Sequence, residues 1–156
     1  MVQPLPPPYE FRFIDKDPYR MCMTDISIDL ELNQIISAAA LLDSRTSELL
    51  HGIHVYDVDL DDGWTHYDRR RAKDAYHPDV KPAVLDLLHE GTRLLLERYK
   101  PQQVVCRTEE PTPLGELPAR FQETIRFLES QGYKRQFLYQ DEEDRWHWEC
   151  ERQELP

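Results

Sequence analysis

Hydrophobic and polar residues alternate through much of the first sixty residues of this chain. In the stretch ISIDLEL, Ile26, Ile28 and Leu30 are separated by single polar residues, the period of two expected of a sheet with one buried face. Residues 33–43 fit either a buried strand or the apolar face of a helix, and we favour a strand. The strands predicted in this half cover residues 9–15, 19–32, 33–43 and 49–60.

The second half of the chain changes to helical spacing. Apolar residues recur three and four positions apart over 79–99 and again over 117–131, which predicts two main helices. Pro101 ends the first helix, and Gly132 stands where a left-handed C-terminal cap of the second is expected. A short buried strand is predicted between them over 102–108.

The stretch QFLYQDEEDRWHWE predicts a β-hairpin near the end of the chain. An acidic turn over 141–144 would pair Tyr139 with Trp146 and Phe137 with Trp148, with all four aromatic side chains on one face. Packing against the core is the simpler interpretation of this face, and an exposed binding or dimer face is the alternative.

Together these elements predict an α+β fold. It consists of a mixed, mostly antiparallel sheet, flanked by the two main helices and completed by the C-terminal β-hairpin. The 156 residues fit a single domain over 9–156, preceded by a Pro-rich, extended arm over 1–8.

The formal net charge of −11 opposes direct binding to nucleic acid or to an anionic membrane. Such an acidic surface either gives solubility or docks on a basic partner. No apolar run is long enough to span a membrane, and MVQPLPPPYEF lacks the features of a signal peptide. Three cysteines, far apart and odd in number, indicate reduced thiols and a cytoplasmic location.

The acidic stretch YDVDLDDGW approaches the pattern of a calcium loop without completing it. A loop starting at Asp57 needs glycine at its sixth position and glutamate at its twelfth, where the chain has Asp62 and Asp68. HGIH and HWEC have the spacing of zinc ligands, but residues three apart on a strand point to opposite faces. We therefore predict no metal site, and the chain also lacks a nucleophile elbow and a glycine-rich phosphate loop.

A basic run precedes the long helix, within residues 61–78, which show no periodicity. It consists of Arg69, Arg70, Arg71 and Lys73. Free N–H groups and the helix dipole favour anions at the start of a helix, so these side chains are candidates for binding phosphate groups. The alternative is that they only balance the acidic stretch just before them.

From residue 49 onward the order of elements is strand, basic loop, long helix, short strand, helix ending in Gly-aromatic, and hairpin. This order resembles the C-terminal half of the GCN5-related N-acetyltransferase (GNAT) fold, and RFLESQGY is similar to a characteristic segment of that family. The resemblance implies that coenzyme A lies between the strand ending at Leu60 and the strand over 102–108, with its pyrophosphate on the basic loop.

Three features depart from the family's pattern. The basic loop has no glycine, which the family uses to bring its backbone close to the pyrophosphate. Leu128 stands where the family has a general-acid tyrosine, and leucine cannot protonate a leaving thiolate. A strand meander replaces two N-terminal helices, so the chain resembles shortened GNAT-like proteins of the kind carried by phages and mobile elements.

The resemblance leads to a first hypothesis, an N-acyltransferase that uses acetyl-CoA or another acyl-CoA. The basic run would hold the coenzyme phosphates, and Asp57 or Asp59 would orient or deprotonate the amine of a small cationic acceptor. The alternative is a non-catalytic GNAT-like protein whose acidic face binds or inhibits a basic, nucleic-acid-handling protein. A third hypothesis is a homodimer formed through the aromatic hairpin.

Overall fold

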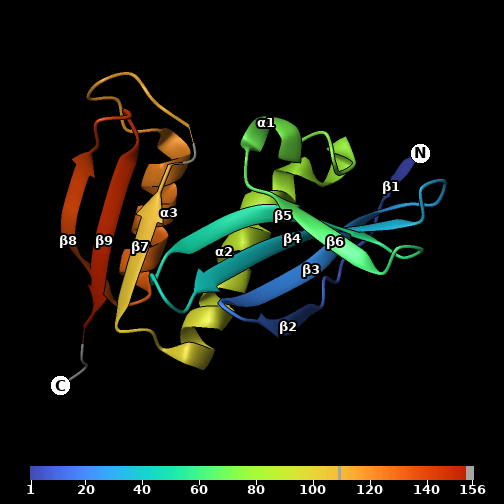
Figure 1. The fold of residues 1–156 in the computed structure, drawn as a ribbon, viewed down its shortest axis with the longest axis horizontal. Helices are drawn as coiled ribbons and strands as arrows, with labels where there is room; N and C mark the ends of the chain where they lie inside the picture. Colours follow the sequence, from blue (N-terminus) through green and yellow to red (C-terminus); the bar gives the residue numbers. More distant parts are fainter. Residues whose placement is uncertain (109, 154–156) are drawn as a thin grey trace.

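A computed structural model describes residues 1–108 and 110–153, except for the side chains of residues 69 and 70. It contains a six-stranded sheet of order β1-β3-β4-β5-β6, in which β2 also pairs with β3, and a three-stranded sheet of order β7-β9-β8 (Figure 1). Neighbouring strands within each sheet are antiparallel. The predicted α+β class is therefore confirmed, with mostly antiparallel strands, two main helices and a C-terminal hairpin, but the strands form two sheets where a single sheet was predicted.

The elements follow one another in a simple order. The large sheet contains β1 (Val2–Pro4), β2 (Phe11–Lys16), β3 (Tyr19–Asp29), β4 (Gln34–Asp43), β5 (Leu49–Asp57) and β6 (Asp62–His66). Two short helices, α1 (Arg69–Ala72) and η1 (Pro78–Val80), lead into α2 (Lys81–Tyr99). The small sheet and its helix are β7 (Gln103–Arg107), α3 (Ala119–Ser130), β8 (Tyr133–Gln140) and β9 (Trp146–Arg152).

The ambiguous segment over 33–43 is a strand, as favoured from the sequence. β4 lies in the middle of the large sheet, between β3 and β5. Its alternate residues are buried on opposite faces, with Ala38 in one apolar cluster and Ala39 and Leu41 in another. Because both faces are covered, the strand has a continuous apolar run in place of an alternating pattern.

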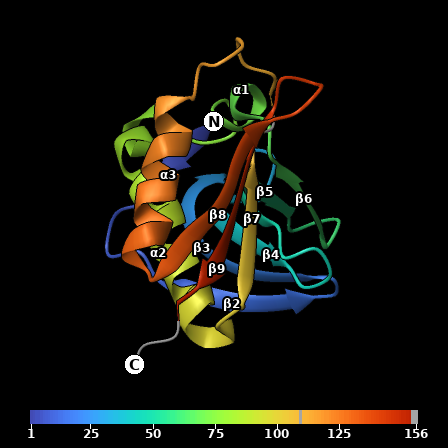
Figure 2. The same ribbon diagram turned by 90° about the vertical axis from the view of Figure 1, so that its left-hand side faces the viewer.

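The two main helices lie on the same side of the two sheets (Figure 2). Helix α2 packs closely on the large sheet at Gly91, where an added Cβ would lie 3.3 Å from the carbonyl oxygen of Cys22 and 3.5 Å from the Cβ of Ala40. Small residues on both elements therefore allow the close approach. Within the described part of the chain, no helix combines the length and apolarity needed to cross a membrane.

Part of the N-terminal arm pairs with the large sheet. Val2 lies opposite Asp29 in the β1–β3 ladder, and the backbone N–H of Leu5 donates to the carbonyl oxygen of Ile26 over 2.9 Å. The amino group of Met1 lies 3.4 Å from a carboxylate oxygen of Asp29. The arm is thus a short edge strand at its start.

The region over 61–78, which shows no periodicity in the sequence, contains β6 and α1. Strand β6 is a five-residue edge strand with no fully buried side chain, so it carries no alternation of apolar and polar residues. Helix α1 has four residues, which is too short to display a helical period. Strands β3 and β5 also end three residues earlier than predicted, because Leu30, Leu32 and Leu60 lie in exposed turns.

The register predicted for the C-terminal hairpin is wrong by one residue. Tyr139 lies opposite His147, and Leu138 lies opposite Trp148. The turn extends over 141–145, because one carboxylate oxygen of Asp141 accepts hydrogen bonds from the backbone N–H groups of Glu143 and Arg145. The predicted aromatic face is therefore divided: Trp148 is completely buried, whereas Phe137 and Tyr139 are 61% and 45% exposed.

This register predicts opposite effects for two aromatic residues of the hairpin. Trp148→Ala should lower the free energy of unfolding by about 3–5 kcal/mol, because it leaves a cavity in the core between β9 and α3. Phe137→Ala, the matched control on the outer face, should change it by about 0.5 kcal/mol or less. Urea unfolding followed by circular dichroism measures both, and equal losses would contradict the register.

Candidate functional site

The two sheets meet where β5 begins. The backbone N–H of Val105 in β7 donates to the carbonyl oxygen of Ser47 over 2.9 Å, and Val105 forms a parallel bridge with Glu48. Beyond this contact β5 continues between β4 and β6, whereas β7 pairs with β9. The two strands therefore separate, as Figure 1 shows.

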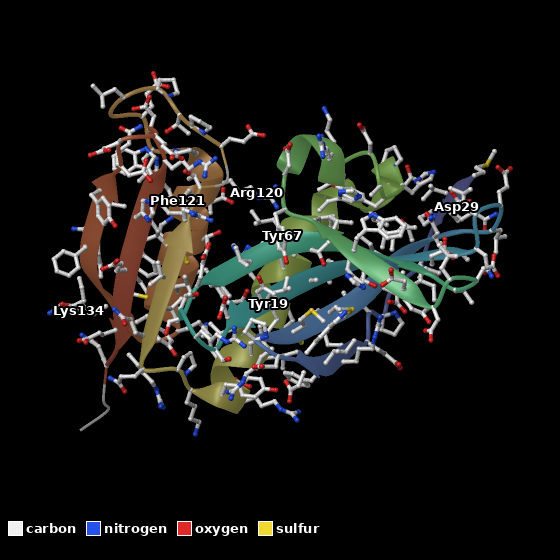
Figure 3. All side chains as sticks on the ribbon, in the orientation of Figure 1. Tyr19, Asp29, Tyr67, Arg120, Phe121 and Lys134 are labelled. Carbon is white, nitrogen blue, oxygen red and sulfur yellow. The ribbon has the colours of Figure 1, made fainter. Side chains whose placement is uncertain are left out.

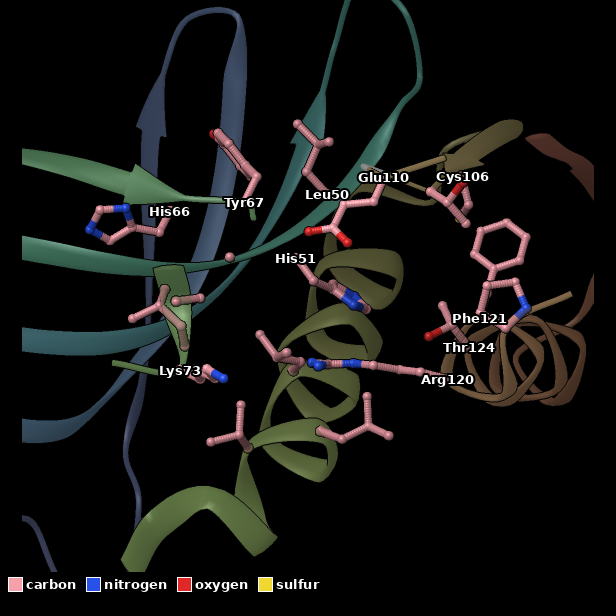
Figure 4. Close-up of a pocket in the computed structure, with 18 of the residues that line it drawn as sticks. Leu50, His51, His66, Tyr67, Lys73, Cys106, Glu110, Arg120, Phe121 and Thr124 are labelled. Atoms are coloured by element: carbon pink, nitrogen blue, oxygen red, sulfur yellow. The ribbon is translucent and has the colours of Figure 1, made fainter. Parts of the chain in front are cut away.

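A cavity of about 740 Å³ lies between the separated strands. Its walls come from the start of β5, the first half of α2, the loop after β7 and the start of α3 (Figure 4). Ile53, Leu88 and Phe121 give the lining an apolar part. A volume of this size is typical of sites that bind small molecules or cofactors.

The charged part of the lining is mainly cationic, although the whole chain is acidic. The basic side chains that line the cavity are Lys73, Lys81, Arg107 and Arg120, and Glu110 lines it as well. Arg107 lies 3.4 Å from a carboxylate oxygen of Glu48, whereas Lys73 and Lys81 have no ion-pair partner among the residues that the structure describes. Figure 4 shows Lys73 and Arg120 entering from opposite walls. Such a lining favours an anionic ligand with an apolar part.

His51 projects from β5 into this cavity and is held by α2. Its Nε2 lies 2.8 Å from the hydroxyl oxygen of Thr92, which is buried and donates to the carbonyl oxygen of Leu88 over 2.8 Å. Since a hydroxyl has one proton, both contacts are hydrogen bonds only if His51 carries its proton on Nε2. Its Nδ1 then has a free lone pair, which can accept a hydrogen bond.

Burial lowers the pKa of His51 to about 3, and its electrostatic interactions with His89 and Arg120 act in the same direction. The imidazole is therefore neutral at physiological pH. A second histidine, His89, lies with its ring 6.0 Å from that of His51, stacks on Phe127 at 4.6 Å and contacts the Thr124 hydroxyl over 3.2 Å. Burial also lowers the pKa of His89, so two neutral histidines connect β5, α2 and α3.

The cysteine in this lining is not poised for nucleophilic chemistry. Cys106 is 4% exposed, and burial raises the pKa of its thiol well above the usual value. The thiolate is the reactive form of cysteine, and burial disfavours it here. All three cysteines of the chain are free and buried, as the sequence indicates for reduced, packed thiols.

The structure brings one member of the predicted basic run to the cavity. Lys73 lines it, whereas Arg71 is exposed and is not part of the lining. Helix α1 starts with Arg69 and Arg70, whose side chains lie outside the described residues. The phosphate-binding role of the run stays a prediction, now centred on Lys73.

Asp57 is the last residue of β5 and Asp59 lies in the turn between β5 and β6, and neither belongs to the lining. A carboxylate oxygen of Asp57 accepts from the backbone N–H of Leu60 over 3.0 Å, and one of Asp59 accepts from the Asn33 side-chain amide over 2.9 Å. At the rise of an extended strand, Asp57 lies about 13 Å from Ile53, the last residue of β5 that lines the cavity. Their catalytic role therefore stays a prediction, and the two carboxylates do not line this cavity.

Sequence reasoning missed His51, Lys81, Arg107 and Arg120. In the sequence, the spacing of the two histidines in HGIH suggested only a possible pair of metal ligands. In the structure His51 and His54 contact different hydroxyls, those of Thr92 and Thr65. A histidine within an apolar strand was the available signal, but its meaning depends on α2, which lies some forty residues away along the chain.

Comparison with known proteins adds no assignment. No protein-family model, no curated protein and no solved structure matched this chain. Within residues 1–108 and 110–153, no three potential metal ligands lie close enough to form a metal-binding group. The cavity itself and the resemblance of the element order are therefore the basis for a functional proposal.

The neutral state of His51 predicts a pH dependence of stability. Its folded pKa of about 3 lies below the ordinary value of 6.5, so the unfolded chain binds more protons between these values. The stabilising contribution is therefore complete above pH 6.5 and is lost as pH falls toward 3. From pH 7 to pH 5, His51 alone should account for a loss of about 2 kcal/mol in the free energy of unfolding.

Urea unfolding of the wild type and of His51→Leu at pH 5, 6, 7 and 8 tests this. The leucine variant should lose less stability on acidification than the wild type. Between pH 7 and pH 8 the difference between the two proteins should stay nearly constant, which serves as the control. Parallel curves from pH 8 down to pH 5 would contradict the buried, neutral histidine.

Proposed function

We propose that the chain is a divergent acyl-CoA-dependent N-acyltransferase that acts on a cationic amine and holds its coenzyme in the cavity between β5 and β7. The supporting observation is the coincidence of two independent inferences. The GNAT resemblance implies a coenzyme between these two strands, and the cavity lies there, with Lys73 of the basic run in its lining.

The lining matches the chemistry of an acyl-CoA. This coenzyme joins charged phosphate groups to a long, weakly polar arm that ends in the thioester. Lys73 and Lys81 can pair with phosphate groups, whereas Ile53, Leu88 and Phe121 can contact the arm. A ligand without negative charge would leave the two lysines without a partner in this site.

The departures from the family's pattern restrict how the coenzyme can bind. Strand β6 pairs with β5 from Ile53 to Asp57, so only the first part of β5, over 49–52, is left to contact the arm. The basic segment contains no glycine and begins with the short helix α1, so we propose that lysine side chains hold the phosphates in place of loop amides.

The reaction forms a carbon–nitrogen bond and breaks a carbon–sulfur bond. The ammonium group of the acceptor first loses one proton to water, and the neutral amine nitrogen attacks the thioester carbonyl carbon. The sulfur leaves as a thiolate that takes a proton from water, and the nitrogen gives up its second proton. We propose that Nδ1 of His51 accepts the amine hydrogen, since negative phosphates in the same cavity would raise the pKa of His51 toward the working range of a general base. Glu110, whose carboxylate points into the cavity near His51 in Figure 4, would attract the cationic acceptor.

Coenzyme binding can be measured by ligand-dependent stabilisation. Acetyl-CoA at about 100 times its dissociation constant should raise the free energy of unfolding by about 2.7 kcal/mol. Lys73→Ala should weaken binding about tenfold, because one charge-assisted contact is lost. Arg71→Ala, a nearby exposed cation outside the lining, is the matched control and should weaken it less than about twofold. An absence of stabilisation at millimolar coenzyme would remove acyl-CoA from the proposal.

Catalysis requires a separate measurement. Release of free coenzyme A thiol from acetyl-CoA should depend on an added primary amine, with polyamines favoured over neutral amines. His51→Gln should reduce kcat by about 100-fold, because a general base is lost, while acetyl-CoA affinity stays close to that of the wild type. Turnover that is independent of His51 in a folded variant would contradict the role given to this residue.

A further inference from the structure

Two turns at one end of the large sheet share a five-residue pattern. The β3–β4 turn includes DLELN over 29–33, and the β5–β6 turn includes DVDLD over 57–61. Each begins with aspartate, continues with an apolar residue, an acidic residue and leucine, and ends with a residue of positive φ. These last residues are Asn33, with φ of 50°, and Asp61, with φ of 47°.

Turn geometry accounts for the first and last positions of the pattern. A carboxylate oxygen of Asp29 accepts from the backbone N–H groups of Glu31 and Leu32 over 3.0 and 3.1 Å, and Asp57 accepts from that of Leu60 over 3.0 Å. Asparagine and aspartate are the residues, after glycine, that tolerate the left-handed conformation best. The middle three positions of each turn have no such requirement.

Large apolar side chains nevertheless fill two of the three middle positions in both turns. We name these four residues the turn patch: Leu30, Leu32, Val58 and Leu60, which are 65%, 59%, 41% and 72% exposed. Exposed turns ordinarily contain polar residues and glycine, and neighbouring exposed apolar residues indicate an interaction surface. The turn hydrogen bonds do not require apolar side chains at these four exposed positions.

Hydrogen bonds join the two turns. The backbone N–H of Val58 donates to the carbonyl oxygen of Asn33 over 3.0 Å, and the Asn33 side-chain amide donates to Asp59 over 2.9 Å. Figure 1 shows both turns projecting from the same end of the large sheet, near the N-terminus, and Figure 3 labels Asp29 at this end. The patch is therefore held in a fixed arrangement, far from the small sheet.

The charges around the patch select the kind of occupant. Carboxylates of Glu31, Asp59, Asp61 and Asp62 stand among the apolar residues, and the amino group of Met1 lies 3.2 Å from a carboxylate oxygen of Glu31. No lysine or arginine occurs within 29–33 or 57–62. A second copy of this chain, with its own net charge of −11, would place like charges together, and so would an anionic membrane. A basic surface with apolar side chains is the complementary occupant.

We propose that the turn patch docks an amphipathic helical segment of a basic partner protein. The apolar face of that segment covers the four side chains, while its lysine and arginine residues pair with the surrounding carboxylates. This site is separate from the cavity, so it does not depend on the acyltransferase proposal.

The test uses the full-length, ¹⁵N-labelled protein and a synthetic helical peptide of leucine and lysine with one apolar face. A peptide of the same composition with scrambled order is the control for charge alone. Amide shifts on titration should concentrate in 29–33 and 57–62, and the affinity should fall steeply with added salt. Equal binding of the scrambled peptide, or shifts spread over the surface, would overturn the proposal.

Variants separate the apolar and the charged contributions. The patch variant changes all four residues to serine and should weaken binding at least about tenfold, whereas Glu31→Gln with Asp59→Asn should reduce the salt dependence. Both retain Asp29 and Asp57, which accept the backbone hydrogen bonds of the turns. Leu114→Ser with Phe137→Ser, at exposed apolar positions elsewhere, is the matched control and should leave the affinity within about twofold.

The patch variant also distinguishes a second copy of the chain from a basic partner. Light scattering should find the same mass for the wild type and the patch variant. Self-association of the wild type that the serine substitutions abolish would assign the patch to a homodimer and overturn the proposal. Melting temperatures of all variants confirm that each is folded before its binding is compared.

Discussion

The separation of β5 from β7 is the constraint on which the cavity depends. Two strands in contact at Glu48 and Val105 could continue as neighbours in one sheet. They do not, because β6 takes the edge of β5 from Ile53 onward. In the part of the chain that the structure describes, no strand covers β5 over 49–52 on this side, so its backbone polar groups face a space that a ligand can enter.

Helix α2 keeps the separated sheets in a fixed relation. Leu88 belongs to the apolar cluster of the large sheet, whereas Leu96, two turns later, packs in the cluster under the small sheet. The His51–Thr92 hydrogen bond and the stacking of His89 on Phe127 add polar and aromatic contacts between the same parts. The cavity is therefore bounded by packed elements, which is the condition for a preformed site.

The sequence predicts those helices and strands that are long enough to show a local pattern of apolar and polar residues. Alternation predicts β3, and helical spacing predicts both main helices. Strand β4 was favoured from its apolar run and β5 from its β-branched and aromatic content, whereas β6 and α1 are too short and too exposed to show a pattern. The hairpin register failed because it depends on where Asp141 caps the turn, which alternation alone does not determine. Lys73 was predicted because its position before a helix is local, but Arg107, Arg120 and His51 meet only through long-range packing.

The net charge of −11 conceals two regions of opposite character. Read along the sequence, the acidic stretch ending at Asp62 and the basic run starting at Arg69 look like two sides of one cleft. Strand β6 lies between them, so the carboxylates gather at the far end of β5 while cations line the cavity at its start. A separation of about 13 Å or more exceeds the Debye length at physiological salt. An anionic ligand and a basic partner can therefore bind without much electrostatic influence on each other. The net charge of the chain predicts neither of these two binding sites.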